Sequence, residues 1–439
     1  MKSPAFIRRL FAPAAATGSK ADRHTRKTVA LCHALLSERG EASGAALARE
    51  ALEAYRPLSG PALYAFFDVL AQEFSPDPDA VDAAASAYRL DASQASLIRL
   101  QHVVESPRQE LFRRLNLAAG GTAALVEMRR RVLRELRTQA DWAGIDADLS
   151  HLLNSWFNRG FLTLQRIDWR TPALVLEKLM AYEAVHEIQG WRDLRRRLES
   201  DRRCFAFFHP ALPDEPIIFI EVALAKGMSD RVQPLLDPDS PVVDPAGADT
   251  AIFYSITNCQ EGLRGISFGN FLIKQVAEDL GREFPRVKTF ATLSPVPGFR
   301  RWLAATAGAQ PGLADVLAAL SAEDWTRRAG PGSRMRTELM RLCAYYLQRA
   351  KHGDDPADAV ARFHLGNGAR MERLNWLADT SKSGMARSAG MMVNYVYRLK
   401  DVERNHEAYA RNHVVVASPG LSLLARASVM ARRQAARRT

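Results

Sequence analysis

The stretch Phe253-Tyr-Ser-Ile-Thr-Asn-Cys-Gln-Glu-Gly-Leu-Arg-Gly-Ile-Ser-Phe-Gly-Asn-Phe-Leu-Ile-Lys274 decides how the second half of the chain is expected to fold. Its first residues are β-branched or aromatic and predict a buried strand, whereas 271–280 has helical spacing of its apolar residues. Gly262, Gly265 and Gly269 separate the two and let the backbone approach a ligand closely. Because a helix start favours an anion, the stretch predicts a phosphate-binding loop. A plain strand–turn–helix connection would explain the same glycines.

Further strings downstream carry a family resemblance. Ser294-Pro-Val-Pro-Gly-Phe299 ends a strand-like segment, and Phe363-His364-Leu-Gly-Asn-Gly368 follows a long helical stretch. With Met371-Glu-Arg-Leu-Asn-Trp-Leu-Ala-Asp379, Met392-Val-Asn-Tyr-Val-Tyr397 and the segment 169–186, these strings resemble the malonyl-CoA decarboxylase family in their order and spacing. The resemblance covers most of the chain.

The resemblance implies decarboxylation of malonyl-CoA to acetyl-CoA and carbon dioxide through a thioester enolate that is protonated at carbon. It places an acid–base pair on Ser294, as proton acceptor or relay, and on His364, as proton donor. No cofactor is expected, because the thioester carbonyl holds the electron pair and coenzyme A is part of the substrate. The resemblance also implies substrate-binding residues, namely Arg264, Gly265, Ile266, Ser267, Phe268, Gly269, Asn270, Asn394 and Tyr397.

The same residues also have ordinary structural explanations. A serine at a strand end is commonly a turn residue, and an asparagine and a tyrosine on an apolar strand can simply complete a sheet. Histidine is nevertheless the side chain that titrates near neutrality, and Gly366 and Gly368 permit an irregular, ligand-facing backbone around His364. These features favour His364 as the group that moves a proton.

Composition sets limits on the class of protein. The 439 residues suffice for two domains, and 47% hydrophobic with 25% charged residues is typical of a globular chain. No apolar run has the length needed to span a bilayer, so no membrane contact is expected. The four cysteines are far apart, which argues against disulfides and a metal site. The net charge of +11 is spread along the chain without a nucleic-acid-binding motif, so no nucleic-acid partner is expected.

The sequence pattern divides the chain into a flexible leader (1–26), a helical domain (27–198) and a catalytic domain (199–439). The predicted class is α+β and multidomain, with an all-α amino-terminal domain followed by an α/β domain that binds acyl-CoA. Its predicted hairpin (203–208 and 216–224), strand, glycine loop, helix and strand resemble the acetyltransferase (GNAT-like) fold. The helical domain is expected to form a homo-oligomer, and the family resemblance suggests a tetramer.

Two other functions remain open at this point. An acyl-CoA-dependent N-acetyltransferase would use the same fold, although Gly262, the first glycine after Gln260, lies one position away from its place in the usual acetyltransferase loop. A basic helical interaction protein would explain the net charge, but it leaves the Ser294 and His364 strings unexplained. The expected location is a bacterial cytoplasm, with the mitochondrial matrix as the alternative, because the first residues are basic and poor in acids.

Overall fold

The computed structural model describes residues 20–38, 40–266, 268, 272–307, 311–322 and 324–431. The chain forms two compact units. The first consists of the residues up to Leu162, together with His209–Pro213 and Gln260–Phe268. The second consists of Thr163–Phe208, Asp214–Cys259 and the residues from Gly269 onward.

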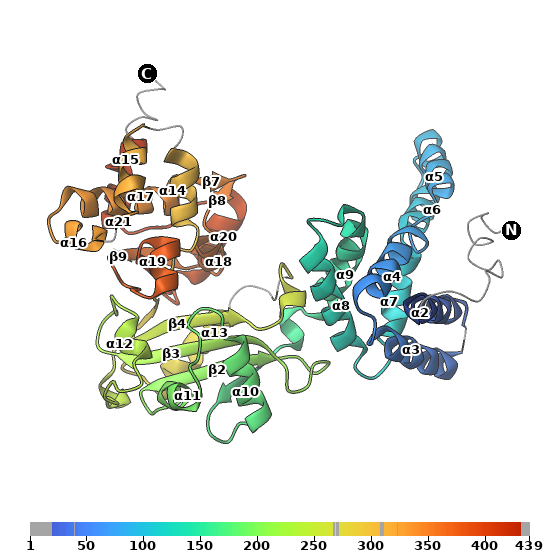
Figure 1. Ribbon diagram of the computed structural model, residues 1–439, viewed down its shortest axis with the longest axis horizontal. Coiled ribbons are helices and arrows are strands. Elements are labelled where there is room, and N and C mark those ends of the chain that lie inside the picture. Colours follow the sequence, from blue (N-terminus) through green and yellow to red (C-terminus); the bar gives the residue numbers. More distant parts are fainter. Residues whose placement is uncertain are drawn as a thin grey trace. The chain divides into compact units, whose positions relative to one another are not determined.

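The first unit is helical and corresponds to the blue-to-teal helices of Figure 1. Its helices are α2 (Lys20–Ser37), α3 (Glu41–Tyr55), α4 (Gly60–Gln72), α5 (Pro78–Leu90), α6 (Gln94–Val104), α7 (Pro107–Leu115), α8 (Gly121–Glu135) and α9 (Ala143–Trp156), with short 3-10 turns at η1 (Ala140–Trp142), η2 (Arg159–Phe161) and η4 (Glu261–Leu263). Side-chain oxygens of Asp77, Ser93 and Ser106 accept first-turn N–H groups and fix where α5, α6 and α7 begin.

Helices α5 and α6 form a hairpin that buries little of its own surface. Among the described side chains, α5 buries Ala84 and α6 buries none. Leu90 is 90% exposed and Ile98 is 44% exposed, and Val104 is also exposed. Helices of this length are marginal by themselves and depend on tertiary packing for their stability. The hairpin therefore presents apolar surface that the described residues leave exposed.

In the second unit the described strands form an eight-stranded mixed sheet in the order β1-β2-β3-β4-β5-β10-β6, with β9 paired to β10. The strands are β1 (Thr163–Ile167), β2 (Arg202–Phe208), β3 (Pro216–Ala225), β4 (Thr250–Asn258), β5 (Thr289–Thr292), β6 (Ser294–Pro295), β9 (Arg370–Asn375) and β10 (Met392–Val396), and β7 (Lys351–His352) and β8 (Asp355–Pro356) form a separate ribbon. Strands β4 and β5 are parallel, whereas the other pairs are antiparallel.

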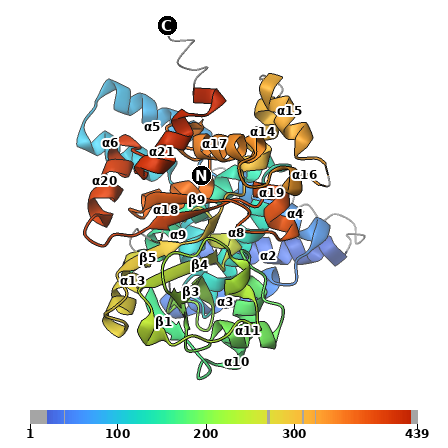
Figure 2. The same cartoon turned by 90° about the vertical axis from the view of Figure 1, so that its left-hand side faces the viewer.

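Helices join and flank these strands (Figure 2). They are α10 (Ala173–Tyr182), α11 (Trp191–Arg197), α12 (Gln233–Leu236), η3 (Pro245–Gly247), α13 (Leu272–Glu283), α14 (Phe299–Ala307), α15 (Pro311–Ala319), α16 (Trp325–Arg328), α17 (Arg334–Arg349), α18 (Ala359–Gly366), α19 (Lys382–Ser388), α20 (Val402–Asn412) and α21 (Pro419–Arg426). A parallel pair of strands needs a crossover connection, and α13 lies in the connection between β4 and β5.

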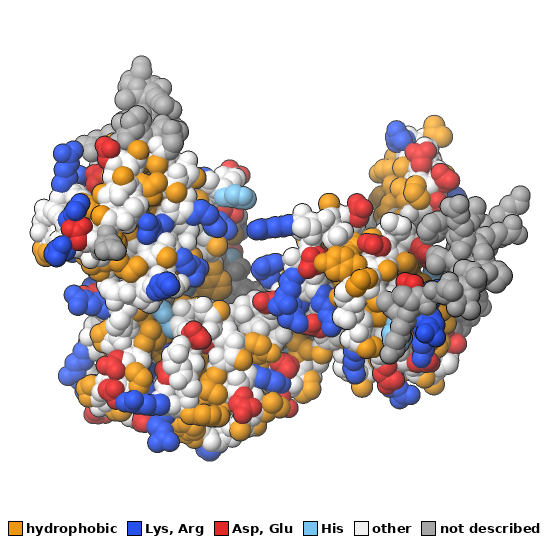
Figure 3. All heavy atoms as spheres, in the orientation of Figure 1, with side chains coloured by type: hydrophobic (Ala, Val, Ile, Leu, Met, Phe, Trp, Pro, Cys, Tyr) orange, Lys and Arg blue, Asp and Glu red, His pale blue; other side chains and the backbone are white. Residues whose placement is uncertain are grey.

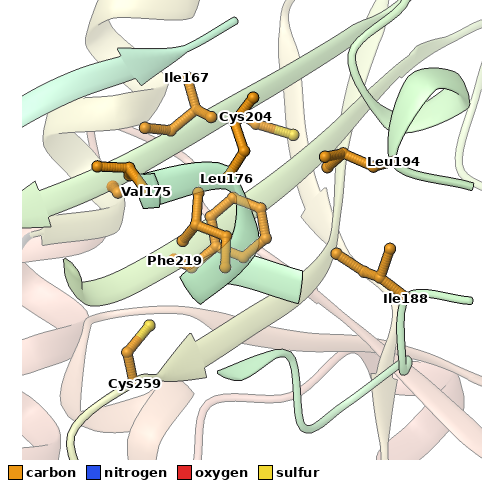
Figure 4. Close-up of a cluster of buried hydrophobic side chains, with 10 residues drawn as sticks. Ile167, Val175, Leu176, Ile188, Leu194, Cys204, Phe219 and Cys259 are labelled. Carbon is orange, nitrogen blue, oxygen red and sulfur yellow. The ribbon is translucent and has the colours of Figure 1, made fainter. Parts of the chain in front are cut away.

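An apolar cluster joins α10 and α11 to β2 and β3 (Figure 4). Its members include Leu176, Leu179, Leu194, Cys204 and Phe219, all of them buried. Strand β3 is buried over nearly its whole length, which agrees with the apolar run of its sequence, interrupted only by Glu221. This cluster fixes one side of the sheet.

Charged side chains are buried beside this cluster. The Arg197 side chain donates from Nε to Asp193 Oδ1 at 2.8 Å and from a terminal nitrogen to Glu221 Oε2 at 2.9 Å. Burial raises the pKa of Glu221 to about 8, although the Arg197 guanidinium opposes this shift. Burial thus favours the protonated form of Glu221, whereas the ion pair with Arg197 favours its carboxylate.

The structure agrees with the expected class and divides the chain at a different place. The α+β class, the helical first region, the hairpin β2–β3, the strand β4 and the helix α13 are confirmed. The second unit begins at Thr163, not at residue 199, because β1 pairs with β2 and because α10 and α11 pack on the sheet. The expected leader lies mostly outside the described residues, but 20–26 belongs to α2 and is helical.

The four cysteines are free and buried. Burial raises the pKa of the Cys32 thiol to about 12 and raises the pKa of Cys204, Cys259 and Cys343 as well. Such thiols are protonated and poor nucleophiles, which agrees with a structural role for Cys259. No helix in the described part of the chain combines the length and the apolar character that a membrane crossing requires.

Candidate active site

His364 lies in the last turn of α18. Asp358 Oδ1 accepts the N–H of Ala361 at 2.9 Å and starts the helix. The helix is followed by Gly368 at a φ of +80°, where a Cβ atom would lie 2.1 Å from the carbonyl oxygen of Val402. The expectation of an irregular backbone around His364 is therefore wrong. The irregular position is Gly368, which closes the turn after the helix.

A continuous chain of hydrogen bonds passes through His364. Its Nδ1 atom lies 2.8 Å from the hydroxyl of Tyr397, and its Nε2 atom lies 2.9 Å from Ser294 Oγ. Ser294 Oγ in turn donates to Thr292 Oγ1 at 2.8 Å. Strands β5, β6 and β10 and helix α18 bring these side chains together, and all of them are buried. The structure thus joins three residues that the sequence had singled out, Ser294, His364 and Tyr397.

Burial determines the charge of the His364 imidazole. It lowers the pKa of His364 to about 3, so the imidazole of the free protein is neutral at physiological pH. This differs from the expectation of a histidine that titrates near neutrality. In a neutral imidazole one nitrogen donates and the other accepts. The position of the ring proton therefore sets the direction of the hydrogen bonds to Tyr397 and Ser294.

We expect the neutral imidazole to make the fold sensitive to acid. In the unfolded chain His364 binds a proton below its ordinary pKa of about 6.5, whereas in the folded chain it stays neutral down to about 3. The unfolded state thus binds more protons in this window, and the free energy of unfolding falls as the pH falls. Between pH 6.5 and 5 the loss attributable to His364 is about 2 kcal/mol.

Urea unfolding of the wild type and of His364→Gln at pH 7 and pH 5 measures this contribution. Glutamine does not titrate, so the acid-induced loss of stability should be smaller in the variant by about that amount. All other titrating groups are common to both proteins. An equal loss in both proteins would contradict a buried, neutral His364.

The sequence analysis missed two neighbours of His364. Thr292 Oγ1 accepts the bond from Ser294 and also the N–H of Tyr395 at 3.2 Å. The ring of Tyr395 stacks on the imidazole, with ring centroids 4.3 Å apart. Its hydroxyl is buried and has no partner among the described residues. The signal was present, since Thr292 is two residues before Ser294 and Tyr395 two before Tyr397, a spacing that places strand residues on one face.

The side-chain amide of Asn394, expected to bind substrate, makes all its hydrogen bonds within the protein. Its Nδ2 atom donates to the carbonyl oxygens of Thr292 at 2.8 Å and of Ser229 at 3.2 Å. Its Oδ1 atom accepts from Asn375 at 2.8 Å and from Arg373 at 3.1 Å. These four bonds use the full capacity of the amide. Asn394 therefore cross-links strands of the sheet and has no polar group left for a substrate.

The predicted phosphate-binding loop belongs to the first unit. Arg264 and Gly265 are exposed, with Gly265 at a φ of +82°, whereas Ile266 and Phe268 are buried. Ser267, Gly269 and Asn270 lie outside the described residues, so their expected contacts stay predictions.

The glycines of this loop serve packing as well. A Cβ atom at Gly262 would lie 2.0 Å from the carbonyl oxygen of Val126, so the glycine lets the loop pack on α8. Buried Arg129 donates to the carbonyl oxygens of Gly262 at 2.7 Å and of Arg264 at 2.9 Å. Within the described residues, no cluster of three His, Cys, Asp or Glu side chains could hold a metal ion.

Comparison with known families extends over both units. Residues 160–435 match the malonyl-CoA decarboxylase C-terminal domain, and residues 74–157 match the malonyl-CoA decarboxylase N-terminal domain. The mitochondrial malonyl-CoA decarboxylase of Anser anser anser is 36% identical over 353 residues, which cover 73% of this chain and 69% of the relative. The mitochondrial malonyl-CoA decarboxylase of Rattus norvegicus is 34% identical over 358 residues, covering 74% and 73%.

Solved structures give the same result. The crystal structure of malonyl-CoA decarboxylase from Rhodopseudomonas palustris has a TM-score of 0.86 and 49% identity, and the match covers 90% of this chain and 98% of that one. The corresponding structure from Agrobacterium vitis has a TM-score of 0.84 and 49% identity, covering 91% and 99%.

Proposed function

Because this chain belongs to the malonyl-CoA decarboxylase family, we propose that it converts malonyl-CoA to acetyl-CoA and carbon dioxide with Ser294 and His364 as its acid–base pair. The observation that carries the assignment of roles is the buried 2.9 Å hydrogen bond between Ser294 Oγ and His364 Nε2. The family assignment also favours decarboxylation over the two alternative functions. Neither an N-acetyltransferase nor a basic interaction protein requires the Ser294–His364 pair.

The reaction makes limited demands on the protein. Breaking the bond to the carboxylate leaves an electron pair on the carbon beside the thioester, and the thioester carbonyl holds that pair as an enolate. The protein must orient the carboxylate, stabilise the oxyanion and return one proton to carbon. A well-placed oxyanion donor contributes about 3 kcal/mol, and a positioned acid or base accelerates the reaction by about 10²- to 10⁴-fold.

His364 would take up its proton together with the substrate. The malonyl carboxylate brings a negative charge into a site where the imidazole is neutral, and a nearby negative charge favours the imidazolium. Both ring nitrogens then donate, so Tyr397 and Ser294 accept, and the Ser294 hydroxyl proton is free to turn from Thr292 toward the substrate. When carbon dioxide leaves, Ser294 passes its proton to carbon and regains one from His364 Nε2, which returns the imidazole to its neutral form.

Turnover of malonyl-CoA by the purified protein tests this function. Without added metal, acetyl-CoA and carbon dioxide should form in equal amounts. In D₂O the acetyl methyl group should carry one deuterium, because the proton that reaches carbon comes from groups that exchange with solvent. Transfer of the acetyl group from added acetyl-CoA to an amine, with no release of carbon dioxide from malonyl-CoA, would instead identify an N-acetyltransferase.

We further propose that the helical unit forms a homo-oligomer. The family resemblance suggests a tetramer. The α5–α6 hairpin supports this proposal, because it exposes Leu90, Ile98 and Val104 on helices that bury little within the chain. The bacterial cytoplasm remains the proposed location, supported by the higher identity to the bacterial structures than to the mitochondrial relatives.

A charge on this hairpin is expected to weaken assembly. Ile98→Glu should shift the oligomer toward smaller species by at least about tenfold in its dissociation constant, because burying an unpaired carboxylate at an interface costs more than 1.4 kcal/mol. Light scattering coupled to size-exclusion chromatography over a range of concentrations measures the shift. Gln101→Glu adds the same charge at an exposed polar position of α6 and is the matched control. Equal behaviour of both variants would place the contacts elsewhere.

A further inference from the structure

One pocket of the second unit lies away from the hydrogen-bond chain of His364. Its volume is about 570 Å³, within the range of small-molecule sites. The end of β3 from Ala223 to Lys226, helix α12 and the loop that leads to β4 surround it. Leu235, Pro241 and Val243 give it apolar walls. Arg196, Asp201 and Arg202 complete the lining with charged groups.

The charges in this lining do not balance. Arg196 binds the Asp201 carboxylate through both of its terminal nitrogens, at 2.7 and 2.9 Å, and Arg202 binds the same carboxylate at 2.9 Å. Arg196 is 4% exposed, Arg202 5% and Asp201 1%. Two buried guanidinium groups therefore share one carboxylate. A buried charge without a counter-charge is costly, so an additional anion would be stabilised here.

Unused donors point to the same chemistry. The Nε atoms of Arg196 and Arg202 have no hydrogen-bond partner among the described residues. The remaining bonds of Arg202 go to the carbonyl oxygens of Asp201 at 3.2 Å and of Leu235 at 3.4 Å, which are weak acceptors at long range. Burial lowers the pKa of Arg202 and the Asp201 carboxylate only partly offsets this shift. Guanidinium groups match carboxylate and phosphate geometry, so these are the head groups to expect.

The surroundings add positive charge. Lys226 is exposed at the pocket and makes no hydrogen bond or ion pair with any described residue. Asp244, the other acid of the lining, turns its carboxylate to the N–H of Ala246 at 3.0 Å. A neighbouring pocket of about 470 Å³ shares Arg196 and Ser240, and its lining includes Arg195, Glu199 and the exposed ring of Trp191, together with Arg192, which pairs with Asp239. Figure 3 shows basic, acidic and apolar side chains mixed over this end of the unit, where α11 and α12 lie.

We propose that this pocket binds a small organic anion, with a carboxylate or phosphate head group at Arg196 and Arg202 and a short aliphatic chain against the apolar walls. The site is separate from the reaction site. Ala225, in its lining, pairs with Thr250 at the start of β4, whereas Ser294 follows the far end of β5, which runs parallel to β4. An anion bound here therefore does not occupy the site formed by Ser294 and His364.

Calorimetric titration of the full-length protein tests the proposal with three probes that share one chain length. Octanoate carries a carboxylate, octyl phosphate carries a phosphate, and 1-octanol carries no charge. We expect one molecule of octanoate or of octyl phosphate per chain, with the tighter of the two identifying the head group, and no saturable binding of 1-octanol. Binding should persist when coenzyme A is present at saturation, because the two sites are separate.

Val243 provides the matched variants. Its side chain is exposed, and its N–H donates to Asp201 Oδ2 at 3.2 Å. Residue 243 therefore lies beside the charged groups that line the pocket. Val243→Glu adds a competing carboxylate and should weaken octanoate or octyl phosphate binding by about tenfold or more, whereas Val243→Gln should bind within about twofold of the wild type. Malonyl-CoA turnover should be unchanged in both. Absence of binding, equal binding by both variants, or displacement by coenzyme A would each overturn the proposal.

Discussion

His364→Ala is expected to lower kcat for malonyl-CoA by about 10²- to 10⁴-fold, while KM changes by only a few-fold. The substitution removes the ring that links Ser294 to Tyr397, and with it the proposed proton source for carbon. Steady-state rates of acetyl-CoA release measure the effect. His352→Ala makes the same change at an exposed histidine and should retain wild-type activity. Circular dichroism and urea unfolding establish that each variant is folded.

Ser294→Ala separates a relay from an independent contribution. If the proton passes from His364 through Ser294 to carbon, the two single variants lose similar activity, and the double variant is little worse than either. Additive losses would mean that the two residues act in separate steps. A His364→Ala protein with near wild-type kcat would move the proton donor to another group of the chain, with Tyr397 the nearest candidate.

Arg197→Met is expected to lower the free energy of unfolding by about 3 to 5 kcal/mol, the cost of breaking a buried ion pair from one side. The substitution leaves Asp193 and Glu221 buried without their common cation. Urea unfolding at pH 7 measures the change. Arg195→Met removes the same group from an exposed position of α11 and should cost less than about 0.5 kcal/mol. A small loss from Arg197→Met would show that this charge cluster is not needed for stability.

Local patterns predicted the sheet of the second unit well. The hairpin β2–β3 and the strand β4 have long β-branched and aromatic runs, and α13 buries Leu272, Ile273, Val276, Ala277 and Leu280 on one face. The strand β1 was missed, because its short run Thr163–Ile167 alternates weakly and follows a long helical region. Its pairing with β2 comes from tertiary structure, which a local pattern does not contain.

The site was predictable only in part. Motif strings identified Ser294, His364 and Tyr397, and the structure brings these side chains into one hydrogen-bond chain. The state of His364 could not be predicted, because its low pKa follows from complete burial and not from any neighbour in the sequence. The contacts of Asn394 could not be predicted for a similar reason, since its partners Ser229, Thr292, Arg373 and Asn375 come from distant segments.

The four buried thiols make the native protein a poor substrate for alkylating reagents. Each cysteine must leave its packed surroundings and ionise before it can react, so the rate of modification depends on how often that segment opens. Cys32 lies in the first unit, whereas Cys204, Cys259 and Cys343 lie in the second unit. Mass spectrometry of the alkylated peptides can therefore follow local opening of the two units separately, and neither unit needs an engineered label.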